Sequence, residues 1–439
     1  MVNINDLSFK YEEGGVALFS SFSLNIEEGE RVLLISTPGS GKTTLSRILT
    51  GSAPKYTGGI LSGTVIINGV DILSLDTPER IRYTSRVNQN SDEMILFSTL
   101  YEELSFPLEN LGYEESVIKE KAEWALSEFD LTRYKEVSTA ELSGGEKKRL
   151  MIAILFLIDP ELYILDESFD ELSPFWRAKI AKLIKERGRS VLILGSHFLP
   201  TYEGLYDRVI TIKDGKAAPY ERETVSASPV EKPNGKTLSV KDIALSRPHR
   251  SLKEENPFSL DVSSFSIEGG KCTLLLGENG SGKSTLSKVL CGLLKEERGT
   301  VNIASKLVAI KERRKEVAYL MQNPFEQLFL PTVKEELEST DAKKEDIERA
   351  LELFSLSPDW YISEIPYGSA KLVQAAVFYL LKRPFAIFDE LDSALSYSDS
   401  LKAVNAYLES GTGLLIITHD EYFASLFKGK CYRIEGGKI

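Results

Sequence analysis

Two kinds of hydrophobic pattern recur along the chain. Apolar and polar residues alternate over Asn3–Phe9 and Phe22–Ile26, which predicts antiparallel strands with one buried face. A further strand is expected at Ile81–Val87, and a short amphipathic helix at Leu45–Leu49. Short runs that are almost wholly apolar predict buried strands, and these runs are Arg31–Ile35, Leu162–Leu165, Ser190–Leu194, Cys272–Leu276 and Phe385–Phe388. The chain therefore belongs to the α/β class.

The polar motifs at the ends of these strands occur twice. A glycine-rich loop ending in Lys42 recurs 241 positions later at Lys283, whereas an Asp-Glu pair at Asp166 recurs 223 positions later at Asp389. Self-similarity of this kind predicts two copies of one domain in tandem. The separation between matching motifs falls from 241 to 223 positions along the chain. This indicates that the second copy has lost residues in surface segments, where deletions are tolerated.

A linker is predicted between the two copies. Pro219, Pro229, Pro233 and Gly235 stand there among charged and small residues, a composition typical of a connecting segment. We expect a first domain at 1–217, a linker at 218–236 and a second domain at 237–439. Such a linker spans at most about 70 Å when extended, which is enough to join two packed domains.

Composition narrows the class of protein. No apolar run reaches the ~18 residues of a membrane span, and the first residues resemble no signal peptide, so a cytoplasmic protein is expected. Three cysteines without a Cys-x-x-Cys pair are expected to be reduced core thiols rather than metal ligands. A formal charge of −12 disfavours a broad nucleic-acid surface.

Each glycine-rich loop follows a buried strand and precedes a helix, which is the context of a phosphate loop. Its backbone N–H groups bind phosphates, its lysine neutralises them, and the next hydroxyl ligates Mg²⁺. The first loop begins with Ser36 where the pattern has glycine, so its Cβ is expected to crowd the turn. The expected ATP-binding residues are Ser36, Gly39, Ser40, Gly41, Lys42, Thr43 and Thr44 in the first copy, and Gly277, Asn279, Gly280, Ser281, Gly282, Lys283, Ser284 and Thr285 in the second.

The segment Glu141–Arg149 is a polar turn that runs into an apolar helix, with Ser143 as its N-cap. Gly144 and Gly145 leave backbone N–H groups uncovered at the helix start, which suits an anion. Read alone, the segment is equally an ordinary helix start. A strand that ends in Asp166-Glu167 follows it. The segment Glu141–Arg149, here called the signature, is thus followed by a helix, a strand and two carboxylates. This order, together with the phosphate loops, resembles the ATP-binding cassette (ABC) ATPases over nearly the whole chain.

This resemblance implies two tandem P-loop NTPase domains, each with a mixed sheet core, an antiparallel β subdomain and a helical subdomain. It implies ATP and Mg²⁺ as cofactors, with Ser143, Gly144 and Gly145 contacting ATP. The Mg²⁺ ligands it implies are Thr43, Asp166 and Gln89 in the first copy, and Ser284, Asp389 and Gln322 in the second. The catalytic residues it implies are Glu167, Gln89 and His197, with Glu390, Gln322 and His419 as their counterparts.

The resemblance also implies that Tyr11 stacks on adenine. On its own, a tyrosine in a polar loop is more often plain surface. The matching position in the second copy falls near Arg247, where no aromatic residue is found. The residue that would stack on adenine in the second copy is left open between Arg247 and His249.

The second signature departs from the family pattern. Ser143 falls on Pro366 and Gly144 on Tyr367, so the second copy lacks the hydroxyl and the small residue. In the family, two domains pair head to tail, and each ATP lies between one phosphate loop and the other signature. The second phosphate loop would then form an intact, hydrolytic site with the first signature, and the first phosphate loop a degenerate one.

The segment from Gln322 to Glu336 resembles the energy-coupling factor (ECF) ATPases of vitamin and metal-ion importers, and the first copy echoes it after Gln89. This implies a peripheral ATPase beneath a membrane coupling subunit and a small substrate-binding membrane protein. The partner is expected to dock at 90–106 and 323–337, on apolar residues that we expect to be exposed, namely Met94, Ile95, Phe97, Phe325, Leu328 and Phe329. The alternative is an ABC-type ATPase acting on ribosomes or DNA, which usually carries a charged arm, metal-binding cysteines and two intact signatures. The transported substrate is not encoded in this chain.

Overall fold

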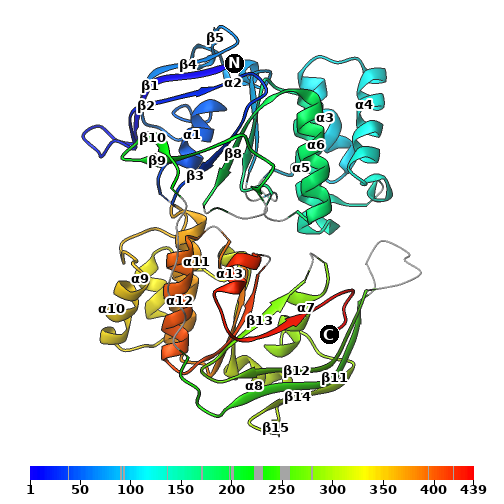
Figure 1. Cartoon of the computed structure of the whole chain (residues 1–439), viewed down its shortest axis with the longest axis vertical. Coiled ribbons are helices and arrows are strands. Elements are labelled where there is room, and N and C mark those ends of the chain that lie inside the picture. The colour runs from blue at the N-terminus through cyan, green and yellow to red at the C-terminus, as the bar shows by residue number, and fades with distance from the viewer. Residues whose placement is uncertain are drawn as a thin grey trace. The chain divides into compact units, whose positions relative to one another are not determined.

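In a computed structural model, the chain forms two compact units, here called the first and second domains (Figure 1). The structure describes all residues except 38, 89–90, 92–93, 136, 170–171, 197, 199–201, 222–230, 248–257, 278–279, 394 and 419. Gln89, His197, His249, Asn279 and His419, all proposed from sequence, thus lie outside the described residues, as does the Arg247 side chain. None of the described helices is long and apolar enough to cross a membrane.

The first domain contains an antiparallel sheet beside a mixed one. The antiparallel sheet has the order β2-β1-β4-β5, and the second sheet the order β10-β9-β3-β8-β7-β6, in which only β10 runs antiparallel to its neighbour. The strands are β1 (Val2–Lys10), β2 (Phe19–Ile26), β3 (Arg31–Ile35), β4 (Ile60–Ile67), β5 (Val70–Asp71), β6 (Thr84–Val87), β7 (Leu162–Asp166), β8 (Ser190–Gly195), β9 (Arg208–Lys213) and β10 (Lys216–Pro219).

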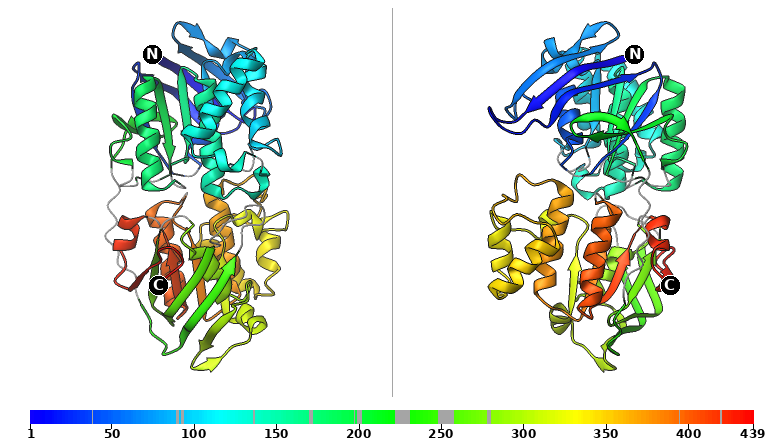
Figure 2. Two further views of the ribbon diagram at one scale, coloured as in Figure 1. Left: turned by 90° about the vertical axis from the view of Figure 1, so that its right-hand side faces the viewer. Right: turned by 60° about the vertical axis from the view of Figure 1, so that its left-hand side comes forward.

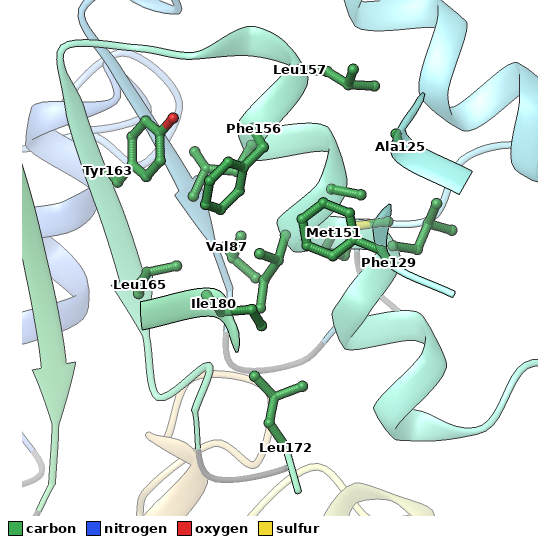
Figure 3. Close-up of a cluster of buried hydrophobic side chains, with 14 of the residues drawn as sticks. Val87, Ala125, Phe129, Met151, Phe156, Leu157, Tyr163, Leu165, Leu172 and Ile180 are labelled. Carbon is green, nitrogen blue, oxygen red and sulfur yellow. The ribbon is translucent and has the colours of Figure 1, made fainter. Parts of the chain in front are cut away.

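Helices cover the sheets of the first domain on two sides. The helix that follows β3 packs into an apolar core between the two sheets, while a separate helical layer packs with the other face of the mixed sheet. Figure 3 shows part of this second core, with Met151, Phe129 and Val87 among its side chains. The helices are α1 (Lys42–Leu49), α2 (Thr77–Arg80), α3 (Leu100–Asn110), α4 (Glu115–Glu128), α5 (Gly144–Ile158) and α6 (Pro174–Arg187).

The second domain repeats this plan. Its antiparallel sheet has the order β12-β11-β14-β15, and its described core strands form a parallel sheet in the order β16-β17-β18-β13-β19. The strands are β11 (Thr237–Arg247), β12 (Phe258–Glu268), β13 (Cys272–Leu276), β14 (Arg298–Ile303), β15 (Lys306–Leu307), β16 (Val317–Leu320), β17 (Phe385–Asp389), β18 (Gly413–Ile417) and β19 (Lys430–Arg433).

The helical layer of the second domain is built around one long helix. Helices α9 and α10 both pack against α11. In the right-hand view of Figure 2 they are the yellow helices, and α11 beside them has a lighter orange than α12. The helices are α7 (Lys283–Leu290), α8 (Ile310–Glu316), α9 (Val333–Glu338), α10 (Lys344–Leu353), α11 (Tyr367–Leu380), α12 (Tyr397–Glu409) and α13 (Glu421–Ser425).

Two details differ from the expectations drawn from sequence. The strand expected at Ile81–Val87 begins at Thr84, because α2 and a turn occupy the residues before it. Cys431 is not a core thiol: it lies exposed on β19 at the sheet edge, whereas Cys272 and Cys291 are buried. The expected α/β fold, with two similar domains in tandem, is confirmed.

Candidate functional site

The glycine-rich loop of the second domain leaves β13 and enters α7 at Lys283. Gly282 caps this helix with φ 109°, a left-handed conformation, and a Cβ there would come within 2.8 Å of Phe258. Gly41 holds the same place in the first domain, with φ 103° and Phe19 at 2.7 Å from the position of a Cβ. Only glycine fits both constraints, so the loop backbone reaches the helix N-terminus in the form that a phosphate group needs.

The lysine side chains of both loops lie back over their own loop. Lys283 Nζ donates to Gly277 O at 2.8 Å, and Lys42 Nζ donates to Ser36 O and, at 3.3 Å, to Thr37 O. Burial lowers the pKa of Lys42, although the negative charges of Glu167 and Asp166 oppose this. The Ser281 and Ser40 hydroxyls are buried without a hydrogen-bond partner among the described residues. A loop with such donors fits the phosphates of ATP.

Ser36 is accommodated without a left-handed backbone. Its hydroxyl is buried and donates to Ile212 O on β9 at 3.1 Å. In the second domain, a Cβ at Gly277 would lie only 2.5 Å from Ile434 O. The crowding expected at Ser36 is therefore replaced by a hydrogen bond to the neighbouring strand.

Two of the Mg²⁺ ligands expected in the second domain lie together. Ser284 Oγ donates to Asp389 Oδ2 at 3.0 Å, and the buried Tyr319 hydroxyl donates to the same oxygen at 2.6 Å. Burial and the charge of Glu390 raise the pKa of Asp389, while these two hydrogen bonds oppose the rise. A carboxylate and a hydroxyl are hard oxygen ligands that suit Mg²⁺, so the donor set fits this ion.

The first domain has a different neighbour at the matching carboxylate. Arg86 in β6 and Tyr319 in β16 hold the same register, opposite Ile164 of β7 and Ile387 of β17. Arg86 Nη1 donates to Ser46 Oγ of α1 at 2.9 Å. Burial and Glu167 raise the pKa of Asp166 to about 6, against the opposing charges of Arg86, Lys42 and Lys148. A cation thus stands in the first domain where the second has a phenol.

The glutamates that follow these aspartates share an unusual backbone. Glu167 has φ 48° and Glu390 φ 55°, values that are uncommon for residues other than glycine and that cluster at functional sites. Gln322 Nε2 donates to Glu390 Oε2 at 2.8 Å, and Ser196 Oγ donates to Glu167 Oε1. The structure therefore brings together Gln322, Glu390 and Asp389, three residues expected at one site.

Tyr11 lies beside the phosphate loop of the first domain. Its hydroxyl is 2.7 Å from Thr44 Oγ1, and its ring meets Phe9 edge-on with centroids 4.9 Å apart. The side chain is 46% exposed. An aromatic face that is held in place but open to solvent has the form needed for stacking on a base.

The two signature segments begin their helices in different ways. In the first domain Ser143 is the N-cap of α5, and Glu146 accepts from Ser143 N at 2.8 Å. Gly144 and Gly145 form the first turn. In the second domain Pro366 is the N-cap of α11, and the Tyr367 hydroxyl donates to Gln322 O at 2.7 Å. Tyr367 thus points to the glutamine loop of its own domain.

Two serines after the carboxylates cap helices. Ser173 accepts from Trp176 N at the start of α6, and Ser396 accepts from Asp399 N at the start of α12. Serine and aspartate are both preferred N-caps. Both serines therefore have a structural role at the start of the helix that follows the carboxylates.

Sequence reasoning did not single out several residues of this region. They lie on strand β6 or β16, on helices that follow a signature, or in the loop after Gln322, and Arg86 and Tyr319 read as ordinary strand residues. For Arg86, Tyr319 and the glutamines, the signal that finds them is the alignment of the two copies, because the paired positions differ in charge or polarity. The others missed are Lys148, Lys371, Gln327 and Gln374.

Known proteins resemble this chain over its whole length. The ABC transporter family matches residues 19–170 and 260–393, more than half of the chain. A putative ABC transporter ATP-binding protein of Treponema denticola is 29% identical over 473 residues, covering 100% of this chain and 96% of its own. The putative HMP/thiamine import ATP-binding protein YkoD of Bacillus subtilis is 29% identical over 487 residues, covering 97% of this chain and 88% of its own.

Solved structures show the same fold at lower identity. A chain from a model of ribosome-bound archaeal Pelota and ABCE1 aligns with TM-score 0.71 and 19% identity over 99% of this chain and 77% of its own. RNase-L inhibitor aligns with TM-score 0.63 and 20% identity over 99% of this chain and 88% of its own. The chain belongs to the ABC transporter ATPase family, with two such domains in tandem and with ATP and Mg²⁺ as its cofactors.

Proposed function

We propose that the chain is the ATP-hydrolysing subunit of an ECF-type membrane importer of a vitamin or a metal ion. It works on the inner face of the membrane with a coupling subunit and a small substrate-binding membrane protein. The observation that carries the proposal is an exposed apolar surface beside Gln322, held in place by a buried glutamate. The relative named as a putative thiamine-type import protein supports the same class.

In the second domain, this exposed apolar surface consists mainly of aromatic side chains. Phe329 is 81% exposed, and Phe325, Leu330, Trp360 and Tyr361 are exposed around it. Backbone hydrogen bonds tie the two segments together, from Val333 N to Trp360 O and from Ile362 N to Pro331 O. Exposed apolar groups gathered in this way mark an interaction site. We name Phe325, Phe329, Leu330, Trp360 and Tyr361 the aromatic surface.

A buried carboxylate holds this loop in shape. Glu336 on α9 is almost fully buried, and its Oε1 accepts from Phe329 N and, at 2.6 Å, from Leu330 N. In the first domain Glu103 on α3 accepts in the same way from Leu96 N and Phe97 N. Both loops are therefore fixed platforms rather than loose apolar segments.

The first-domain loop carries a smaller apolar surface. Leu96 is 69% exposed, and the rings of Phe97 and Phe106 lie 5.1 Å apart. Some residues expected to be exposed are not: Leu328 is buried, and Met94 and Ile95 pack partly against the core. The two surfaces suit two similar but different segments of a membrane partner.

The chemistry proposed for the second domain uses the residues gathered at Asp389. Lys283 neutralises phosphate charge, and Glu390, held by Gln322, orients and polarises the attacking water. Ser284 and Asp389 hold Mg²⁺, which supplies further charge neutralisation. In the head-to-tail pairing, Ser143, Gly144 and Gly145 complete this site, whereas Pro366 and Tyr367 face the first phosphate loop. The first site then holds nucleotide with little turnover.

Fractionation tests the importer against the alternative of a ribosome- or DNA-bound ATPase. We expect the protein to co-purify with membranes, and Phe329→Asp to release it and to stop uptake. The matched control is Leu307→Asp on β15, because Leu307 is also strongly exposed, at 69% against 81% for Phe329, but lies outside the aromatic surface. Unchanged membrane association and transport in folded Phe329→Asp, or recovery of the wild type with ribosomes, contradict the proposal.

A further inference from the structure

One face of α11 is bonded to the loop that carries Gln322. Tyr367, Lys371 and Gln374 are spaced four and three residues apart, so they share one face of the helix. Tyr367 donates to Gln322 O at 2.7 Å, and Gln374 Nε2 donates to Met321 O at 3.2 Å. The helix that carries the degenerate signature thus contacts two consecutive carbonyls of the glutamine loop.

The same face also reaches the catalytic glutamate. Lys371 Nζ donates to Glu390 O and to Ser393 Oγ. The side chain of Gln322 in turn donates to Glu390 Oε2 at 2.8 Å. Main chain and carboxylate of Glu390 are therefore both linked, directly or through Gln322, to α11.

A second glutamine completes this network. Gln327 Oε1 accepts from Gln374 Nε2 at 2.5 Å and from Met321 N at 2.9 Å, and Gln327 Nε2 donates to Tyr319 O at 3.0 Å. The backbone of Tyr319 and Met321, just before Gln322, is thus held by hydrogen bonds with the side chains of Gln327 and Gln374.

The first domain lacks most of these polar groups. Tyr367, Gln374 and Gln327 correspond to Gly144, Met151 and Met94. Met151 lies instead among apolar side chains such as Phe129 and Val87 (Figure 3). Only the lysine is kept, since Lys148 Nζ donates to Asn88 O at 3.0 Å. The fold itself therefore does not need the glutamine pair.

Stability alone does not account for Gln374. The side chain is 1% exposed, and its Oε1 has no partner among the described residues. A buried polar atom without a partner costs free energy that a methionine avoids. Stability therefore gives no reason to favour this amide over the methionine of the first domain, which points to a role in positioning.

We propose that Tyr367, Gln374 and Gln327 are positioning residues for hydrolysis in the second domain. They fix the main chain of Gln322, so that its amide holds the Glu390 carboxylate toward the attacking water. The proposal rests on the proposed function, in which Glu390 acts at the hydrolytic site. The second signature has not merely lost its serine: its helix supports the catalytic residues of its own domain.

Two variants of the full chain test the proposal. Tyr367→Phe removes one hydroxyl, and the double variant Gln327→Met with Gln374→Met copies the pair found in the first domain. We expect kcat to fall roughly tenfold or more in each, because small displacements of catalytic groups are costly. We expect KM, and the affinity of the second-domain phosphate loop for a fluorescent ATP analogue, to stay within about twofold, because neither change touches that loop. The control is Tyr379→Phe, on the same helix but away from the glutamine loop.

The decisive measurement combines variants. In a Gln322→Ala background, Tyr367→Phe should cost little more, because both changes act through one amide. Additive losses, an unchanged kcat in Tyr367→Phe, or a change in KM equal to that in kcat would overturn the inference. Glu390→Gln separates it from the proposed function: full turnover in that variant rejects the hydrolytic site itself, whereas lost turnover with normal Tyr367→Phe rejects only the positioning role.

Discussion

Single residues carry most of the difference between the two nucleotide sites. The glycines and lysines of the phosphate loops could be predicted from sequence, because a left-handed turn before a helix has few solutions. Arg86 and Tyr319 could not, because one polar residue in a short strand matches ordinary alternation. Their role depends on contact with a carboxylate of the next strand, which only the three-dimensional structure shows.

Asp166→Asn should stabilise the protein in a pH-dependent way. The pKa of Asp166 is raised from 3.8 to about 6 by burial and by Glu167. A raised carboxyl pKa means that folding disfavours the ionised form, so stability is lost as pH rises from about 4 through 6. Without Mg²⁺, the variant should gain about 3 kcal/mol at pH 8, since one pKa unit is about 1.4 kcal/mol. The gain should vanish near pH 4.

Urea unfolding in EDTA at pH 8 and at pH 4 measures the free energy of unfolding of the Asp166→Asn variant and of the wild type. A gain of equal size at both pH values would assign the effect to something other than ionisation. Arg86→Leu serves as the matched change, because Arg86 opposes the shift. It should destabilise at pH 8 and much less at pH 4.

At the scale of elements, cap signals and apolar runs were good predictors. Serine at the start and glycine at the end of α6 define that helix, and β8 is buried throughout. The acidic residues Glu103 and Glu336 were not predictable as buried. Each lies among other glutamates in a first helical turn, where the usual reading is a solvated residue, and only the loop folded over it shows the hydrogen bonds.

Glu336→Leu should loosen the aromatic surface. The change leaves the N–H groups of Phe329 and Leu330 without their acceptor, which we expect to cost about 2 to 4 kcal/mol. Hydrogen exchange at Phe329 and Leu330 should become faster, and membrane association should weaken with it. Glu338→Leu, at the exposed end of the same helix, is the control. Unchanged exchange at both amides would show that the carboxylate does not hold the loop.

At the scale of the whole molecule, the duplication allows each domain to be compared with the other. The comparison supports the fold prediction and makes the difference between the two nucleotide sites testable. The order of the core strands is the same in both copies, β9-β3-β8-β7-β6 and β19-β13-β18-β17-β16. The phosphate loops and carboxylates therefore occupy equivalent places in each domain. Three of the changes that distinguish the domains, Ser36 and Arg86 in one and Pro366 in the other, would fall in one composite site if the domains pair head to tail.

Glu390→Gln should therefore reduce ATP turnover far more than Glu167→Gln. In the proposed pairing, Glu390 orients water in the intact site, and its loss should cost roughly 10²-fold or more. Glu167 serves a site that already lacks the facing serine and glycine, so its loss should cost little. The crossing test is Ser143→Arg in the first domain, which should resemble Glu390→Gln in the second. The two changes together should be non-additive, since each disables the same unit. ATP binding at Lys42 should persist in all three variants, and equal losses from Glu167→Gln and Glu390→Gln would reject the asymmetric assignment.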